Sequence, residues 1–467
     1  MFLSTQRWDL DPLKPPTARR RGPSALQVFV GSFALLILVG ALGLLLLPGL
    51  YTGSRLGFVD ALFTATSAVC VTGLVVVDTA TYFTPFGQAW ILLLVQLGGL
   101  GIMTLATLII LALGQRLTRD WEQVTGGDVR VLHRIDEVSL VRAILVYTVA
   151  IESVGALVLW LLWRGELGSA AVWHAVFHSI SAFCNAGFST FTDSLAGFQG
   201  DAPTILWISV LIILGGLGFV VLADLRAWIV ARGSRRLSLN SRIVLIVTGV
   251  LLTGSALLFL VFEAHFDLAA MGLFDRTVNA WFMSVTARTA GFNTIDYATA
   301  TNASLILTLL LMLIGGSPGS TAGGLKTTTV AVLLLLLWTR LRGRQETSVF
   351  GRTIPRDTAE RSAGIVVGSL VLLGACVFIL LLTEYPLETE LDRVRFLSLV
   401  FEAHSAFGTV GLSMGATPDL TTAGRLLIVF LMFVGRVGPL AIASSMAMPR
   451  VRHSPQYRYA HEDVVVG

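Results

Sequence analysis

The chain has few charged residues for its length. Of its 467 residues, 13% are charged and 54% are hydrophobic, and the mean hydropathy is +0.78. A soluble globular protein carries about 25% charged residues. The composition therefore excludes an ordinary soluble domain and predicts an integral membrane protein, for which length is no guide to the number of domains.

Cysteines and catalytic motifs are also scarce. Cys70, Cys184 and Cys376 lie inside apolar segments and indicate neither a disulfide framework nor a metal site. The chain has no HExxH motif and no GxxxxGK[ST] phosphate loop. We therefore expect no enzyme, no covalent cofactor, no nucleic-acid partner and no nucleotide bound by this chain itself. The first apolar run is long enough to span a membrane, so no cleavable signal peptide is expected.

One short pattern recurs four times along the chain. The copies read TSAVCVTGL (66–74), SAFCNAGF (181–188), TARTAGFN (286–293) and SAFGTVGL (405–412). Each carries a glycine at the same place, namely Gly73, Gly187, Gly291 and Gly411. An aromatic residue stands ten positions earlier, at Phe63, Phe177, Trp281 and Phe401. A second glycine follows each copy, at Gly98, Gly215, Gly315 and Gly435. Four such copies indicate an internal repeat.

Each repeat predicts an outer spanning helix, a re-entrant half-helix, a glycine loop and a return helix. The outer helices are expected at 24–47, 140–163, 243–262 and 362–382, and the half-helices at 55–69, 169–183, 272–287 and 394–407. The return helices are expected at 85–113, 203–229, 303–338 and 422–446. A full helix of about 20 apolar residues matches a hydrocarbon core of about 30 Å.

The predicted fold is therefore an all-α integral membrane protein with eight spanning helices and pseudo-fourfold symmetry around a central pore. The repeats are expected to cover 24–115, 138–232, 242–340 and 361–448, between tails at 1–23 and 449–467.

The distribution of basic residues predicts the orientation. Of the 33 lysines and arginines, 24 lie in the segments 7–21, 116–142, 226–242, 340–361 and 450–458. The segments on the opposite side are rich in acids, among them Asp60, Glu263, Asp267 and Glu384. The positive-inside rule then places both termini in the cytoplasm and all four glycine loops on the outer side. The acids there would attract cations to the mouth of a pore.

The chemistry of the four loops suits backbone coordination of a monovalent cation. Irregular backbone at membrane depth must be buried or line a watery cavity. Rings of carbonyl oxygens can replace an ion's hydration shell, and the partly negative ends of the half-helices favour a cation. The predicted filter residues are Cys70, Val71, Thr72, Gly73, Cys184, Asn185, Ala186, Gly187, Arg288, Thr289, Ala290, Gly291, Gly408, Thr409, Val410 and Gly411. Packing of helices through glycine is the alternative reading of any single loop.

A dense run of glycine and proline interrupts the third return helix and predicts a gate. The run is Gly315, Gly316, Ser317, Pro318, Gly319, Ser320, Thr321, Ala322, Gly323 and Gly324. Such a density of helix breakers predicts a loop in the middle of the membrane. Lys326 follows the loop, and Arg436 follows Gly435 in the fourth return helix. A buried arginine below the filter would repel cations and mark a functional site. A salt bridge, for example between Arg436 and Glu152, is the structural alternative.

Other polar residues near the loops are expected to have structural roles. Arg288 and Glu402 could pair with each other or with loop carbonyls, and this would stiffen the filter. His174 and His178 have the i, i+4 spacing of a metal pair, but no third ligand is evident.

The chain resembles the Trk/Ktr/HKT superfamily of cation transporters. The stretches VTGLVVVDTATYFTP, FCNAGFSTF, ARTAGFNT and FGTVGLSMG look like its four pore-loop signatures. Eight helices without an extra N-terminal pair look most like the bacterial Ktr-type membrane subunit. In that family a glycine in all four loops goes with potassium selectivity, and a serine in the first loop goes with sodium preference. Gly73 therefore favours potassium.

The resemblance also implies partners and a location. It implies a multi-pass protein of the bacterial cytoplasmic membrane that forms a homodimer, with a cytosolic ring of nucleotide-binding regulatory subunits of the ATP/ADP or NAD type. Potassium would be the transported ion, with sodium as an activator in some relatives. A sodium-permeable or sodium-coupled transporter is the alternative. An alternating-access transporter is less favoured, because inverted repeats would be expected and these four repeats run in the same sense.

Overall fold

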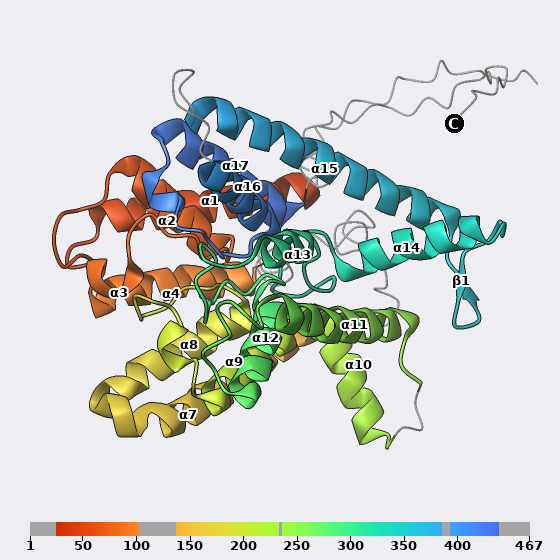
Figure 1. Ribbon diagram of the computed structural model, residues 1–467, viewed down its shortest axis with the longest axis horizontal. Coiled ribbons are helices and arrows are strands. Elements are labelled where there is room, and N and C mark those ends of the chain that lie inside the picture. Colours follow the sequence, from red (N-terminus) through yellow and green to blue (C-terminus); the bar gives the residue numbers. More distant parts are fainter. Residues whose placement is uncertain (1–24, 102–136, 233–235, 385–392, 439–467) are drawn as a thin grey trace, which may run out of the picture.

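The computed structural model describes residues 25–101, 137–232, 236–384 and 393–438. These residues are mostly helical, and the molecule is a bundle of long helices around several shorter ones (Figure 1). The predicted tails at 1–23 and 449–467, and most of the basic segment 116–142, lie outside the described residues.

Four long outer helices begin the four repeats. They are α1 (Ala25–Leu46), α7 (Glu137–Leu167), α11 (Leu239–Phe262) and α15 (Arg356–Glu384). Four stretches of the described chain are long and apolar enough to cross a membrane, namely Gln27–Leu46, Val141–Cys184, Leu239–Phe262 and Arg356–Glu384. The second of these stretches contains α7, a turn of 3-10 helix (η2, Gly168–Ala170) and the short helix that follows.

A short helix and a return helix complete each repeat. The short helices are α2 (Phe58–Val69), α8 (Ala171–Cys184), α12 (Leu273–Thr286) and α16 (Arg393–Gly408). They lie where the half-helices are predicted. The return helices are α4 (Pro85–Gly99), α9 (Ala202–Leu217), α13 (Asn302–Leu313) and α17 (Thr422–Val437). Three aromatic residues of the repeat pattern, Phe63, Phe177 and Phe401, are fully buried.

The second return helix is not one continuous helix. The expectation of one unbroken helix at 203–229 is wrong, because α9 and α10 (Phe219–Val230) meet at a bend of 102°. The bend lies at Gly218, whose φ of +81° is easy only for glycine. α4 ends at Gly99 and α17 at Val437, and residues 102–113 and 439–446 of the predicted helices lie outside the described residues.

The structure therefore does not establish eight spans. Within the described residues, four stretches could span a membrane, or five if α9 and α10 form one bent span.

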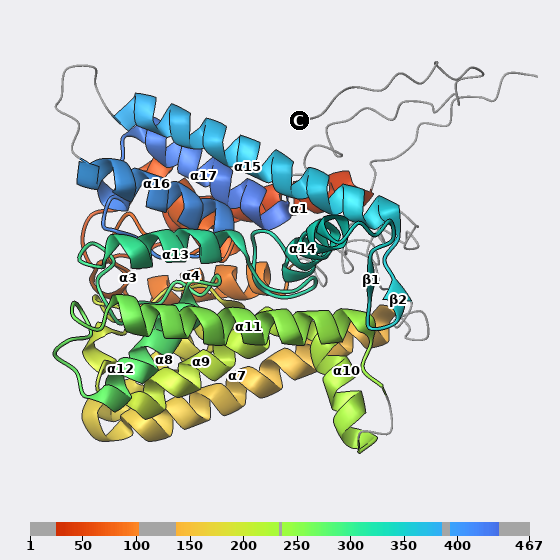
Figure 2. The same cartoon turned by 45° about the vertical axis from the view of Figure 1, so that its right-hand side comes forward.

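The four repeats form a closed ring. Each return helix packs against the short helix of the next repeat, and the pairs are α4 with α8, α9 with α12, α13 with α16, and α17 with α2. The last pair joins the end of the chain to its beginning. Figures 1 and 2 accordingly show α15, α16 and α17 beside α1 and α2, with α7, α8, α9 and α12 on the opposite side.

The remaining elements connect or flank the helices of the repeats. They are α3 (Thr79–Tyr82), η3 (Ala196–Phe198), η4 (Thr417–Asp419), α14 (Thr327–Leu341) and the strands β1 (Ser348–Val349) and β2 (Arg352–Thr353). The strands form a small antiparallel hairpin between α14 and α15. α10 projects away from the bundle (Figure 2).

Candidate ion-conduction site

The four glycine loops share one unusual backbone conformation. The filter glycines have positive φ angles of 90°, 69°, 81° and 95° at Gly73, Gly187, Gly291 and Gly411. Two residues earlier in each loop, a residue other than glycine is also left-handed, namely Val71, Asn185, Thr289 and Thr409, with φ between 50° and 77°. This region is strained for β-branched side chains, and such strain concentrates at functional sites. Val71, Thr289 and Thr409 carry this strain, whereas asparagine adopts the region readily. The same conformation at the same place in four loops indicates one shared task.

The four glycines meet in a ring. A Cβ atom added to a filter glycine would lie within 3 Å of a carbonyl oxygen of the next loop. The distances are 2.4 Å from Gly73 to Ala186, 2.9 Å from Gly187 to Ala290, 2.3 Å from Gly291 to Val410, and 2.1 Å from Gly411 to Thr72. In each case the carbonyl belongs to the residue just before the next filter glycine. The contacts run through all four loops and return to the first, so the ring closes.

A hydroxyl group at the end of each short helix braces its own loop. Ser67 accepts a hydrogen bond from the amide of Gly73 at 3.1 Å and donates to the carbonyl of Leu74 at 2.7 Å. The equivalent braces are Ser181 to Phe188 (2.7 Å), Thr286 to Phe292 (2.5 Å) and Gly411 to Ser405 (3.0 Å). These bonds tie each filter loop to the helix that leads into it.

The second glycines allow the return helices to approach the filter closely. A Cβ atom at Gly98, Gly215 or Gly435 would lie 1.9 Å from the carbonyl oxygen of Val69, Phe183 or Phe407, respectively. Each of these carbonyls belongs to the residue four positions before a filter glycine. The recurrence of a second glycine was visible in the sequence, but its reason is this contact between backbones.

The predicted gate residues form a loop that lies against the glycine-loop regions of the second, third and fourth repeats. The loop starts and ends side by side, because Leu325 N donates to Leu313 O at 3.1 Å and Gly315 N donates to Leu325 O at 2.9 Å. In between, the loop bonds to the break between α9 and α10, where Ser317 N donates to Gly216 O at 3.0 Å. On the other side Gly324 N donates to Gly435 O at 3.3 Å. The loop therefore bridges the second and fourth return helices.

Arg436 contacts the loop rather than an acid. Its guanidinium is 2% exposed and donates to the carbonyl of Thr321 and, at 2.7 Å, to the carbonyl of Gly98. The alternative partner, Glu152, instead accepts a hydrogen bond from the Gln96 side chain at 3.0 Å. Arg436 thus joins the loop to the first and fourth return helices. Lys326 lies at the end of the loop and donates to Ala322 O at 2.6 Å.

Arg288 and Glu402 do not pair with each other. Arg288 donates to the carbonyl of Gly315 at 3.1 Å, so its partner is a loop carbonyl, one of the two options considered. Glu402 is fully buried and accepts from the hydroxyls of Ser413 and, at 2.7 Å, Thr417. These hydroxyls lie in the segment after the fourth filter loop, and they already satisfy the carboxylate.

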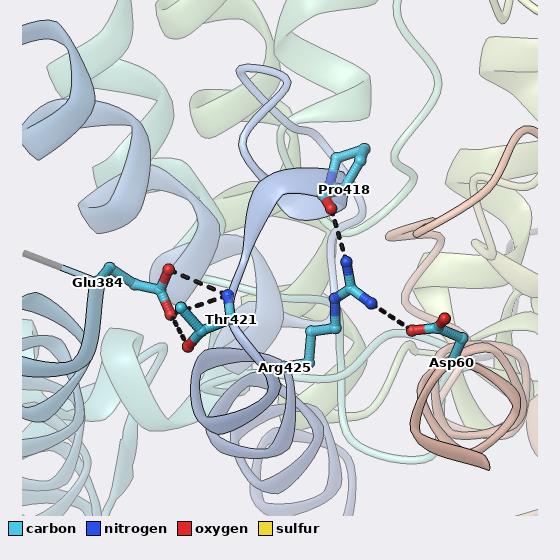
Figure 3. A network of polar contacts seen from close by, with 5 residues as sticks. All are labelled: Asp60, Glu384, Pro418, Thr421 and Arg425. Atoms are coloured by element: carbon cyan, nitrogen blue, oxygen red, sulfur yellow. Dashed lines mark hydrogen bonds and ion pairs between the residues drawn. The ribbon is translucent and has the colours of Figure 1, made fainter. Parts of the chain in front are cut away.

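Several of the acids counted as mouth charges have other roles. Glu384 is 2% exposed and accepts from the amide and hydroxyl of Thr421, the N-cap residue of α17 (Figure 3). Glu263 is fully buried and contacts Thr301, at the start of α13, in the same way. These two carboxylates are buried against the N-cap residues of α13 and α17 rather than exposed at a mouth, which corrects their prediction as mouth charges. Burial raises the pKa of Asp267, an outer-loop acid that accepts from Thr299.

The first and fourth repeats are also joined by an ion pair between the start of α2 and the start of α17. Arg425 forms an ion pair with Asp60 at 2.5 Å and donates to the carbonyl of Pro418 at 2.7 Å (Figure 3). Asp60 stands at the start of α2 and Arg425 in α17. No local pattern indicates this pair, because 365 positions separate its members.

The described residues favour neither a hydrolase nor a metal centre. Residues 315–319 read GGSPG and fit the GxSxG pattern, but in hydrolases that serine lies between a strand and a helix beside a histidine. Ser317 is buried between two helices, and its hydroxyl donates to the carbonyl of Leu217. No cluster of three potential metal ligands occurs in the described part of the chain. His178 bonds Ser189 at 3.0 Å and His174 bonds Thr190 at 2.6 Å.

These features define the class of the protein, which is a multi-pass helical membrane protein whose four repeats surround one axis. Residues 27–454 match the TrkH family, described as cation transport proteins. The chain therefore belongs to the TrkH family, and the resemblance to the Trk/Ktr/HKT superfamily is confirmed.

Individual relatives cover most of the chain. It is 39% identical over 419 residues to the potassium/sodium uptake protein NtpJ of Enterococcus hirae, which covers 89% of this chain and 91% of NtpJ. It is 39% identical over 421 residues to the Ktr system potassium uptake protein B of Bacillus subtilis, again 89% of this chain and 91% of the relative.

The potassium transporter TrkH from Vibrio parahaemolyticus has a similar fold in its crystal structure, with a TM-score of 0.72 over 93% of this chain and 87% of that chain. Its sequence identity is 19%, so the likeness supports the fold alone.

Proposed function

We propose that the chain is a potassium-translocating subunit whose selectivity filter is the ring formed by Gly73, Gly187, Gly291 and Gly411. The observation that carries this proposal is the closed contact of each glycine with the carbonyl that precedes the next. Carbonyl oxygens in such a ring replace the hydration shell of a monovalent cation. Potassium uptake is also the activity in the names of the Bacillus subtilis relative and, together with sodium, of NtpJ.

The loop of residues 315–324 is proposed as the gate. Arg436 donates to the carbonyl of Thr321 within this loop, and the glycines of the loop allow close approach to neighbouring segments at two points. A Cβ atom at Gly323 would lie 2.1 Å from the Thr409 hydroxyl, and one at Gly316 would lie 2.6 Å from Gly216 O. In this position the loop closes the pathway, and Arg436 adds a positive charge that opposes a cation.

Permeation of sodium is the second candidate function. It is favoured by the name of NtpJ, a potassium/sodium uptake protein that is 39% identical to this chain. Gly73 argues for potassium, because any side chain at this position would press on the carbonyl of Ala186 and distort the ring.

The proposed assembly is a homodimer in the bacterial cytoplasmic membrane, with both termini in the cytoplasm and a ring of nucleotide-binding regulatory subunits beneath it. The name "Ktr system" of the relatives supports a multi-component transporter. The hairpin β1–β2 and the arginines around it, in the segment 340–361, are available on the basic side as one contact surface.

The direct test is uptake of potassium and sodium by a host that lacks its own potassium transporters. We expect the chain to restore growth at low potassium, and to do so better when a regulatory subunit is co-expressed. Sodium uptake equal to potassium uptake would favour the second candidate, and uptake of neither ion by correctly inserted protein would contradict both.

A further inference from the structure

The third filter loop is supported differently from the other three. In repeats one, two and four, a glycine of the return helix lies against the carbonyl four positions before the filter glycine. The corresponding glycine of the third repeat, Gly315, lies outside the return helix, because α13 ends at Leu313. The atom nearest to a Cβ built at Gly315 is the carbonyl oxygen of Gly323, which belongs to the gate loop itself.

A hydrogen bond takes the place of this packing. Arg288 stands directly before the strained Thr289 in the third filter loop, and its guanidinium donates to the carbonyl of Gly315 at 3.1 Å. Arg288 is 8% exposed, and its Nε atom has no hydrogen-bond partner. In the part of the chain that the structure describes, Arg288 has no carboxylate partner. Its link to Gly315 is therefore its main polar anchor.

The space around Arg288 makes this anchor important. A cavity of about 20 Å³ lies beside the guanidinium and is lined by Gly216, Val285, Arg288 and Gly316, among others. A volume of this size admits about one water molecule. Packing around Arg288 is therefore incomplete on this side.

The gate loop also touches the second filter loop. The hydroxyl of Thr321 donates to the carbonyl of Phe183 at 3.1 Å, the same carbonyl that lies against Gly215. Movement of the loop would break both bonds together, the one at Phe183 and the one at Gly315. Two neighbouring quarters of the filter would lose a support in one step.

We propose that the gate loop is part of the support of the filter, and that Arg288 and Thr321 are positioning residues that make ion selectivity depend on where the loop lies. The inference rests on the proposed function and adds regulation of the same site: the filter discriminates best when the loop is in place and loosens when the loop moves away.

The test measures the potassium-to-sodium permeability ratio of the full chain in proteoliposomes. Arg288→Met removes the donors and keeps a long apolar side chain, Arg288→Lys keeps one cationic donor, and Thr321→Val removes one hydroxyl from a side chain of the same shape. Loss of a hydrogen bond corresponds to about a two- to tenfold change for a neutral donor such as Thr321, and to about tenfold or more for a charged donor such as Arg288. We expect a fall of that size in the ratio for Arg288→Met and Thr321→Val, with partial rescue by Arg288→Lys.

A matched control uses another arginine of the same repeat. Arg276 donates to backbone carbonyls at the outer end of α12, including that of Met271 at 2.8 Å, far along the helix from the filter. Arg276→Met should leave the ratio unchanged. An equal fall in this control would mean that the selectivity change reports general loosening of the fold, and it would overturn the proposal.

A double-mutant cycle decides whether Arg288 acts through the loop. If it does, Arg288→Met should have no further effect on the ratio once residues 315–324 are deleted. Additive effects would overturn the proposal, as would unchanged ratios in both Arg288→Met and Thr321→Val. The proposed function fails on a different result, a wild-type protein that does not discriminate between the two ions at all.

Discussion

Substitution of Gly73 by serine should lower the selectivity of the protein for potassium over sodium. Gly73 has a φ of +90°, and a Cβ atom there would lie 2.4 Å from the carbonyl oxygen of Ala186 and 3.1 Å from the Cα atom of Gly187. Contacts of a real Cβ atom with backbone below 3.0 Å essentially do not occur. The serine can be accommodated only if one of the two loops shifts.

The size of the effect follows from the strain. A residue other than glycine in a sparsely populated backbone region costs about 1–3 kcal/mol. If relief of this strain displaces the ring, the same free energy bounds the loss of discrimination between potassium and sodium. It corresponds to a roughly 5- to 150-fold fall in the permeability ratio.

The assay is the reversal potential of purified protein in proteoliposomes under opposed potassium and sodium gradients. Gly53→Ser is the matched control, because Gly53 precedes the same short helix and has no atom within 4 Å of an added Cβ. We expect a large fall in the ratio for Gly73→Ser and none for Gly53→Ser. A folded Gly73→Ser protein with wild-type selectivity would refute the assignment of the ring as the filter.

Three further predictions concern the gate and the packing around the filter. Deletion of residues 315–324 should raise potassium flux in the absence of a regulatory subunit. The two ends can be joined, because Leu325 N already lies 3.1 Å from Leu313 O. Unchanged or lower flux in folded protein would count against a gate. Gly98→Ala should destabilise the purified protein by about 1–3 kcal/mol through overpacking, since its Cβ would lie 1.9 Å from a carbonyl oxygen. The same change at Gly31 should be neutral, because no atom lies within 4 Å of a Cβ there. Thermal unfolding of the two variants measures the difference. A double-mutant cycle with Asp60→Asn and Arg425→Met, measured as free energies of unfolding, should give a coupling energy of up to about 1 kcal/mol. The coupling should weaken with salt, because the two side chains are 27% and 23% exposed. Additive effects would show that the pair does not join the first and fourth repeats.

Recurrence made much of the fold predictable. A glycine such as Gly187 is uninformative alone, but four copies with an aromatic ten positions earlier predict a repeat, and the short helices lie where the repeat places them. The class and the family follow from the same pattern. The helical membrane fold was therefore predictable from composition and spacing.

The break in the second return helix was not predictable in the same way. The run around Gly218 is continuously apolar, and hydropathy does not report the φ of +81° that bends the chain by 102°. The roles of charged residues were equally hidden. Glu384 and Glu263 have the composition of mouth charges, yet both are buried and cap helices through Thr421 and Thr301. Such partners lie tens or hundreds of positions away, so only the folded chain brings them together.

The gate loop was predictable from the sequence only in part. Its glycines and its proline predicted a loop, and the structure has one. Its contacts with Arg288, Arg436 and Phe183 depend on three different repeats meeting at one place. The sequence analysis left Glu402 and the loop carbonyls as alternative partners of Arg288. The folded chain decides between them, because it places Gly315 next to the third filter loop.

The central claim is that the ring of four glycine loops binds the transported ion. The most direct measurement is anomalous diffraction from crystals of the full chain in which thallium replaces potassium. The account predicts a peak on the axis between Gly73, Gly187, Gly291 and Gly411 that potassium displaces and sodium at the same concentration does not. Thallium bound elsewhere in the bundle, with an empty ring in an active protein, would contradict it.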